Sequence, residues 1–303
     1  MTEPLPLVSV GVIAHDQGRF VEEALESVVA SDYPRLQLLV LDDGSRDGTD
    51  AAVRRWIAAH PGVDAIHVRH ETARGLGATL NEAVRLARGE LLTGLAADDV
   101  LLPEGIRARV DYLRAHPEKL AVFADAEVMD GDGRPLHGSA IEGHYERFGC
   151  KRGELLREEL LPFSLAFHWA IPGPVFLCRR ESFDIVGLYD EALVTEDFDM
   201  YLRLAAIGKL GFLDRSVARY RVHAGSMTST RHARMLADAA RAARLRADDF
   251  RGAIALRLRA QYHLWHAREE ATGAERAAYW IRARAESALA HAGYGLERWR
   301  LSR

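Results

Sequence analysis

The sequence predicts an α/β protein with a mostly parallel central sheet flanked by helices and with a helical extension at the C-terminus. Through the N-terminal half, short apolar runs alternate with segments of helical periodicity about every 25 residues, a pattern typical of βαβ units. Clusters of polar residues directly follow several of these runs. From residue 231 the composition shifts to alanine and arginine, which we interpret as further helices.

The composition is that of an ordinary globular protein: 303 residues, 48% hydrophobic and 28% charged, with a net charge of −4. This charge gives no reason to expect a nucleic acid as partner. The two cysteines, Cys150 and Cys178, lack metal-ligand spacing, so we expect a reducing compartment. No signal-peptide pattern and no run near the ~18 apolar residues of a membrane span are present. We therefore expect a cytoplasmic protein, with peripheral contact at the inner face of the membrane left open.

The first strand is predicted at residues 7–14, LVSVGVIA, which is β-branched and almost wholly apolar, as a central parallel strand is. Residues 20–30 then carry apolar side chains at helical spacing, and Tyr33-Pro34 ends that helix. The further strands predicted in this half are 37–41, 65–69 and 91–95, and the further helices are 51–60 and 76–88.

Three polar clusters each follow the carboxyl end of a predicted strand: His15, Asp42-Asp43 and Asp98-Asp99. The carboxyl ends of parallel strands meet at one edge of a sheet, where such folds bind their ligands. We therefore expect these clusters, which are distant in the sequence, to form one site.

Asp98 and Asp99 end an apolar run, and two adjacent carboxylates beside a buried strand repel each other and are costly to desolvate. A divalent cation relieves both costs, and Mg²⁺ and Mn²⁺ prefer oxygen ligands. The alternative is a polar turn in which one carboxylate caps the helix that begins near Pro103.

The second half is less regular, and residues 138–161 are interpreted as a loop over the site. Thr195 is expected to cap a helix that begins with Glu196 and Asp197, since acids suit the positive end of a helix dipole. The strands predicted here are 120–129, 175–178 and 217–223, and the helices are 106–116 and 181–186.

Five segments occur in the order VSVGVIAHDQGRFVEEALESV, YPRLQLLVLDDGSRDGT, ARGELLTGLAADDVLLPEG, VGLYDEALVTEDFDMYLRLA and YRVHAGSMT. Together they resemble the family 2 glycosyltransferases, inverting enzymes of the Rossmann-like GT-A fold. The resemblance covers about residues 7–230, so we expect a GT-A domain at 1–230 and a C-terminal helical extension at 231–303. It implies transfer of a sugar from a nucleotide-diphosphate donor to an acceptor hydroxyl, assisted by a divalent metal, Mn²⁺ or Mg²⁺.

The resemblance also implies a metal site, in which the metal neutralises the departing diphosphate. Asp99 would bind the metal directly, and Asp98 would hold the ribose or a water in the second shell of the metal. His223 would meet the metal or the diphosphate, with a structural role as its alternative, and an imidazole ligand would favour Mn²⁺. Many relatives have a further Asp where this chain has Ala96, so metal binding rests on Asp99 and His223.

The donor nucleotide is expected, by the same resemblance, on residues after the first strands. Asp42 would accept a hydrogen bond from the base. His15 stands where a stacking Tyr is common, and Ile13 would contribute its backbone. Arg74 would reach the diphosphate, with a solvated side chain as its alternative. Asp43 is interpreted as a cap of the turn that follows it.

Inversion requires a base on the far side of the sugar, and by resemblance Asp197 is that base, with Glu196 as the runner-up. The alternative is that both acids only stabilise the N-terminus of a helix. Trp169 would stack on an acceptor sugar, or else belong to the core.

The segment 231–303 holds 15 Arg and 8 Asp plus Glu, a net charge of +7. Because the arginines are interleaved with acids, a solvated helical surface is the preferred interpretation. Contact with an anionic membrane through Trp265, Trp280 and Trp299, or a homo-oligomer interface, are the alternatives.

Two other functions compete with sugar transfer. A nicotinamide dehydrogenase would need G-x-G-x-x-G after the first strand, where this chain has a single glycine, Gly18. A catalytically silent protein that binds sugar nucleotides stays open because of Ala96 and Ile13. For an active enzyme we expect a nucleotide-sugar donor, with UDP preferred, and a glycan or lipid-linked acceptor in surface-glycan or polysaccharide synthesis.

Overall fold

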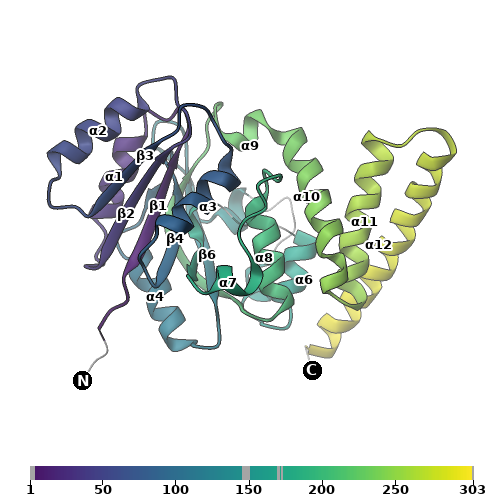
Figure 1. Ribbon diagram of the computed structural model, residues 1–303. Coiled ribbons are helices and arrows are strands. Elements are labelled where there is room, and N and C mark those ends of the chain that lie inside the picture. Colours follow the sequence, from purple (N-terminus) through teal and green to yellow (C-terminus); the bar gives the residue numbers. More distant parts are fainter. Residues whose placement is uncertain (1–3, 145–150, 169–170, 172, 302–303) are drawn as a thin grey trace.

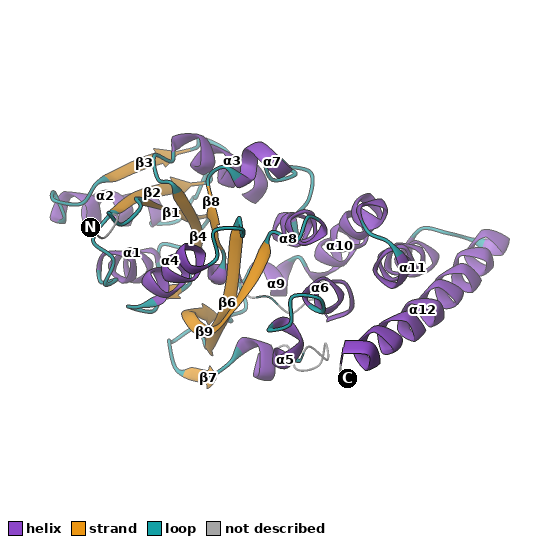
Figure 2. Ribbon diagram, turned by 90° about the horizontal axis from the view of Figure 1, so that it is seen from below, coloured by secondary structure: helices purple, strands orange, loops and turns teal. Residues whose placement is uncertain are grey.

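Figure 1 shows the computed structural model, which describes residues 4–144, 151–168, 171 and 173–301. A twisted sheet occupies one part of the molecule and has helices on both faces. The last helices stand side by side at the opposite end, away from the sheet (Figure 2).

The N-terminal half of the sheet is parallel, with the strand order β3-β2-β1-β4. The strands and helices predicted for this half are all present, because each has a clear apolar periodicity. The elements are β1 (Val8–Ala14), α1 (Val21–Val29), β2 (Leu36–Asp42), α2 (Thr49–Ala59), β3 (Ala65–Arg69), α3 (Leu76–Leu86) and β4 (Leu91–Ala96).

The sheet has two cores, because side chains alternate between the faces of each strand. In β2, Leu38 and Val40 pack in a cluster with α1, α2 and α4 (Gly105–Ala115). Leu39 and Leu41 belong to the larger cluster on the other face, which α3 and α8 (Glu196–Ala206) cover. Burial on both faces explains why these strands are continuous apolar runs in the sequence.

The other half of the sheet continues β4-β8-β6-β9-β5, with β6 and β9 parallel. The predicted α/β class is confirmed. The strand predicted at 217–223 is the end of a longer β9, and the two-residue β5 is too short to show a periodicity. These elements are β5 (Val100–Leu101), β6 (Ala121–Met129), β7 (Pro135–His137), α5 (Arg152–Leu155), α6 (Leu161–His168), β8 (Leu177–Arg179), α7 (Ser182–Val186) and β9 (Leu210–Arg221).

Four α-helices end the chain: α9 (Met227–Thr230), α10 (His232–Arg246), α11 (Gly252–Glu269) and α12 (Gly273–Leu301). Helices α10, α11 and α12 contribute Ala243, Leu258 and Tyr294 to the buried cluster that also contains Phe198 of α8. The same cluster covers one face of the sheet. Among the helices of the described ranges, none is long and apolar enough to cross a membrane.

Candidate active site

A cavity of about 520 Å³ lies between the carboxyl edge of the parallel strands and helix α8. In the parallel register Ala14 lies beside Asp42 and Ile13 beside Ala96, so β1, β2 and β4 end level with one another. The predicted convergence of the polar clusters is confirmed for all but Asp42. The polar lining includes His15, Asp43, Asp98 and Asp99 from the strand ends, and Glu196 and Asp197 from α8.

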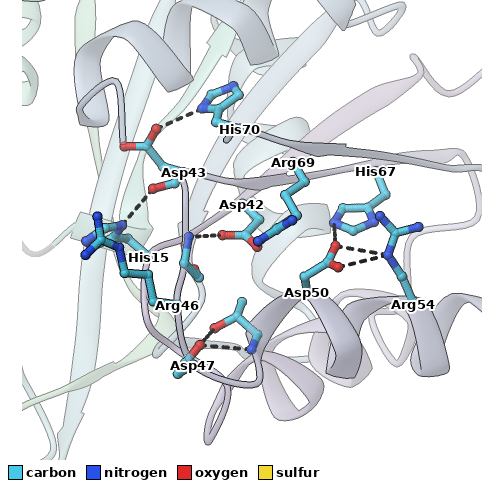
Figure 3. A network of polar contacts seen from close by, with 12 residues as sticks. His15, Asp42, Asp43, Arg46, Asp47, Asp50, Arg54, His67, Arg69 and His70 are labelled. Carbon is cyan, nitrogen blue, oxygen red and sulfur yellow. Dashed lines mark hydrogen bonds and ion pairs between the residues drawn. The ribbon is translucent and has the colours of Figure 1, made fainter. Parts of the chain in front are cut away.

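Asp43 holds together the loops on the sheet side of the cavity (Figure 3). Its carboxylate accepts hydrogen bonds from the backbone N–H groups of Arg74 (2.7 Å) and Gly75 (2.9 Å), and lies 2.8 Å from the ring of His70. Burial alone would raise the pKa of Asp43, but these hydrogen bonds outweigh it and lower that pKa. The carboxylate is therefore ionised and committed to shaping the loop.

Asp42 is fully buried and does not line the cavity. Its Oδ1 accepts the N–H of Ser45 at 2.9 Å, so Asp42 caps this turn and the interpretation of Asp43 as its cap is wrong. Asp42 Oδ2 lies 3.8 Å from Arg69 Nε and has no hydrogen-bond partner in the described part of the chain. Asp43 faces the cavity instead, because successive side chains of an extended chain point to opposite sides.

The turn after β2 also depends on Gly44, whose φ is 73°. A Cβ at this position would lie 2.5 Å from the backbone nitrogen of Ala73. Only glycine therefore allows the turn to pack against the loop that Asp43 anchors. Ala73 itself lines the cavity, so this close approach shapes its wall.

His15 and Ile13 both line the cavity, as predicted, whereas Arg74 does not. The Nδ1 of His15 donates to the carbonyl oxygen of Asp43 at 2.7 Å, which fixes the ring beside the turn (Figure 3). The guanidinium of Arg74 pairs with Glu82 at 2.7 Å. Arg74 thus serves the site through its backbone N–H and not through its charge.

Asp98 and His223 are joined across the sheet edge, with Oδ2 and Nε2 3.0 Å apart. Asp99 is engaged differently, because its Oδ1 accepts the backbone N–H of Arg221 at 2.8 Å. Burial and the neighbouring charge of Asp98 raise the pKa of Asp99 well above its usual range, while Arg221 opposes this. The two adjacent acids are therefore not equivalent.

The side chains of Asp98 and His223 suit a metal ion whose other ligands come from a bound substrate or from water. Within the described ranges, no three His, Cys, Asp or Glu side chains are grouped so as to hold a metal alone. Carboxylate oxygen and imidazole nitrogen are both accepted by Mn²⁺, and sites for such cations often use one or two protein ligands plus substrate phosphates. Asp98 and His223 fit this pattern.

Arg221, at the end of β9, is a residue that the sequence interpretation missed. It is 2% exposed and lines the cavity. Its Nε donates to the carbonyl of Asp98 at 2.7 Å, and another guanidinium nitrogen pairs with Glu23 at 2.6 Å. It also stacks 4.9 Å from the ring centre of Phe20. Arg221 therefore fixes the acidic turn in place.

Glu196 and Asp197 open helix α8 and face the cavity together. Burial raises the pKa of Asp197 to about 6, although the N–H of Phe198 donates to its Oδ1 at 2.7 Å. Burial and then the charge of Asp197 raise the pKa of Glu196 well above its usual range. Glu196 Oε2 is buried without a hydrogen-bond partner among the described residues. Carboxyl groups with raised pKa values in a cavity are candidates for acid and base roles.

Thr195 occupies the N-cap position of α8 but makes no side-chain cap bond, so this prediction is wrong. The donor that such a cap would bind, the N–H of Phe198, is already bonded to Asp197. The Thr195 hydroxyl is buried without a partner in the described part of the chain.

Helix α10 holds the segment that carries these acids. The fully buried Asp238 accepts the N–H of Val194 at 3.1 Å, and Arg234 donates to the carbonyl of Ala192 at 3.2 Å. At the C-terminal end of α10, Arg246 donates a hydrogen bond to the buried Asp199 of α8 at 2.6 Å. The position of α8 thus depends on a helix more than thirty residues downstream.

The start of α10 also contributes to the cavity wall, through Arg231, Met235 and Leu236. Arg231 is exposed, and its side chain forms no ion pair with any described residue. No local motif marks these residues, so they could not be predicted from the sequence. Trp169, predicted at the acceptor side, lies outside the described residues.

Comparisons with known proteins show the family to which this chain belongs. The model of the family described as glycosyl transferase family 2 matches residues 9–179, more than half of the chain. An uncharacterised glycosyltransferase of Rickettsia prowazekii is 27% identical over 227 residues, which are 74% of this chain and 67% of that protein. Chondroitin synthase of Escherichia coli is 26% identical over 74% of this chain, but the match spans only 30% of that protein.

The fold resembles that of the mannosyltransferase PcManGT of Pyrobaculum calidifontis, solved in complex with GDP-Man and Mn²⁺. The TM-score is 0.64 at 22% identity, over 97% of this chain and 81% of that one. The likeness confirms the GT-A architecture predicted from the sequence. The chain therefore belongs to glycosyl transferase family 2 and is a glycosyltransferase.

Proposed function

We propose that the chain transfers a sugar from a nucleotide-diphosphate donor to an acceptor hydroxyl with inversion, and that Asp197 is the general base. The observation that carries this proposal is that Asp197 and Glu196 of α8 and the acidic turn after β4 line the same cavity. A direct displacement needs a base and a leaving-group site on opposite sides of the sugar, and the two sides of this cavity offer them.

Asp197 suits the base role because a pKa of about 6 leaves it ionised at neutral pH and still basic enough to accept a proton. Glu196, whose pKa is raised well above its usual range by burial and by the charge of Asp197, is the second acid beside the acceptor oxygen. A positioned base of this kind contributes roughly 10²–10⁴-fold to the rate.

The donor is proposed to lie along the carboxyl edge of the strands. His15, fixed by the Asp43 carbonyl, offers a ring on which a base can stack, and Ile13 offers its backbone. Asp42 was expected to bind the base, but Asp43 is the acid of this pair that lines the cavity. Arg231 is the cation we propose for the diphosphate, in place of Arg74, which is paired with Glu82.

Asp98 and His223 would hold the divalent metal, with Mn²⁺ favoured by the imidazole. When bound, such a cation neutralises the charge that develops on the leaving diphosphate. Asp99, expected as the direct ligand, already has one oxygen bonded to the Arg221 N–H. PcManGT, which has a similar fold, was solved with Mn²⁺, and this supports the proposal of a divalent metal.

The acceptor is proposed to be a glycan, free or lipid-linked, in polysaccharide or surface-glycan synthesis, and the similarity to chondroitin synthase supports it. The donor base is open: UDP was preferred from the sequence, whereas PcManGT was solved with GDP-Man.

A thermal-shift panel of UDP, GDP, dTDP and CDP, each with and without Mn²⁺, tests the proposal. We expect one nucleotide to raise the melting temperature, and to do so more strongly with Mn²⁺, because ligands that bind only the native state stabilise it. The matching sugar nucleotide should then be hydrolysed slowly by the wild type and not by Asp197→Asn. Binding without hydrolysis in either protein would favour the catalytically silent alternative.

A further inference from the structure

Helix α12 carries four large apolar side chains on the outside of the protein, although its Tyr294 is buried. Ile281, Leu289, Leu296 and Trp299 are 71%, 61%, 68% and 56% exposed. Successive members of this set are eight, seven and three positions apart, so they lie on one face of the helix. Ala285, Ala288 and Ala292 lie between them on the same face. We call these seven residues the outer stripe. Figures 1 and 2 show α12 as the outermost helix, with α11 on its inner side.

The inner face of α12 explains this inverted pattern. Ala283 and Ala290 are buried there, and a Cβ added at Gly293 would lie 2.9 Å from the Cβ of Ala253 on α11. Small side chains therefore let the two helices approach closely. A packed helix normally turns its large apolar residues inward, so their presence on the outer face points to a second surface that covers them.

The charges of α12 are sorted in the same way. Glu286 lies 2.6 Å from His263 and Glu275 lies 3.9 Å from His266 of α11. Arg282 and Arg300 also pair along α12 with Glu286 (3.4 Å) and Glu297 (3.7 Å), but these arginines are 64% and 74% exposed, whereas the two acids are 12% and 30% exposed. By helical periodicity, Arg284 borders the outer stripe on one side, and Arg282 and Arg300 border it on the other. The outer face is thus apolar in its centre and basic along both borders.

We propose that the outer stripe of α12 docks on the surface of a membrane that contains anionic lipids. An apolar face bordered by arginines, with a tryptophan near one end, is the pattern of a helix that lies in the membrane interface. The apolar side chains enter the boundary of the acyl chains while the arginines meet lipid phosphates. The 29-residue helix offers a face roughly 43 Å long at 1.5 Å per residue.

The charge pattern favours a membrane over a second copy of this chain. If two outer stripes met, their arginine borders would face each other, and like charges across an interface are unfavourable. Glu286 and Glu297, which pair with two of these arginines, are far less exposed than the arginines, so positive charge dominates the outer surface. A surface of anionic lipids complements both the stripe and its borders.

Co-sedimentation with phosphatidylcholine vesicles, with and without phosphatidylglycerol, tests the proposal on the full chain. We expect binding to the anionic vesicles only, weakening as salt is added. The double variant Ile281→Glu with Leu296→Glu should lower the partition coefficient by at least about 100-fold. Each change removes an apolar side chain that would be buried in the membrane. Replacing Arg282, Arg284 and Arg300 with Gln should lower it by about 100-fold, near fivefold for each charge.

Ile185→Glu, on α7, is the matched control, since Ile185 is 57% exposed but lies outside the outer stripe. It should bind vesicles as the wild type does, and every variant should keep the wild-type melting temperature. The proposal is overturned if the wild type does not bind anionic vesicles, or if the control loses as much binding as the double variant. A wild-type dimer in light scattering that the double variant abolishes, without vesicle binding, would assign the stripe to a second copy.

Discussion

The two sides of the cavity are built by different means. On the sheet side, the level ends of β1, β2 and β4 place the side chains, and nearby backbone groups bind them, as Arg74 and Gly75 bind Asp43. On the α8 side, the acids sit on a helix whose position depends on Asp238 and Arg246, far along the chain.

The two sides also differ in how well their polar groups are satisfied. Asp43 is fully bonded, and its pKa is lowered, as suits a group that shapes a binding surface. Glu196 keeps an oxygen without a partner among the described residues, and burial raises the pKa values of both Glu196 and Asp197. On the sheet side, Asp42 Oδ2 also lacks a partner among the described residues and the pKa of Asp99 is also raised, but Asp42 does not line the cavity and Asp99 is bonded to the Arg221 N–H. Glu196 and Asp197 combine an unpartnered oxygen with raised pKa values in the cavity wall, which is typical of reacting sites, so we infer that the sheet side binds and the α8 side reacts.

The largest effect that separates the sides is expected for Asp197→Asn. It should lower kcat by about 10³-fold, because a positioned base contributes roughly 10²–10⁴-fold. The dissociation constant of the nucleotide should not change, because we propose that the nucleotide binds on the sheet side. Calorimetry with the nucleotide and a steady-state rate assay measure both. An unchanged kcat would exclude Asp197 as the base.

On the sheet side, Asp98→Ala and His223→Ala should each weaken the Mn²⁺-dependent stabilisation by the nucleotide at least about tenfold. Asp99→Asn is the matched control and should weaken it less, because Asp99 is bonded to Arg221 and not to His223. Thermal shift against Mn²⁺ concentration measures all three. If Asp99→Asn removed the metal effect and Asp98→Ala kept it, the two roles would be exchanged.

Asp238→Ala tests the dependence of α8 on α10. It leaves the N–H of Val194 without its acceptor, which should cost about 1–3 kcal/mol of stability. Displacing the base should also lower kcat about tenfold with an unchanged donor KM.

Asp238→Asn keeps an oxygen acceptor and should recover much of kcat. Asp248→Ala, an exposed acid paired with Arg259, is the control and should change neither quantity. Equal loss of activity in Asp248→Ala would show that any lost charge in this region has the same effect.

The dependence on pH is expected to be no larger than the preceding effects. Because the pKa of Asp197 is raised to about 6, its active ionised form is lost as pH falls through that value. The kcat/KM for the acceptor, at saturating donor, should fall about tenfold from pH 7 to pH 5. Asp43 should stay ionised there, since its pKa is lowered. A flat profile would argue against Asp197 as the titrating base.

The sheet side could be predicted from the sequence because its signals are local. Apolar runs mark the strands, and the parallel arrangement brings His15, Asp43, Asp98 and Asp99 together. The assignment between Asp42 and Asp43 failed because it depends on which residue ends β2. Asp42 is still in the strand, so its side chain turns into the protein and the next one faces the cavity.

The α8 side could be predicted only in part. Glu196 and Asp197 were found through the resemblance, but the support by Asp238 and the wall formed by Arg231 were not. These contacts join residues that are far apart, and an arginine or aspartate in an alanine-rich helix has no local feature that reveals its partner. The Thr195 cap failed for a local reason, since Asp197 competes for the same N–H.

The most direct test of the account is the anomeric configuration of the sugar released when the matching sugar nucleotide is hydrolysed, followed by ¹H NMR before the anomers equilibrate. A direct displacement with Asp197 as base inverts the anomeric carbon, so an α-linked donor should first release the β-sugar. First release of the α-sugar would mean retention and would contradict a single displacement across this cavity.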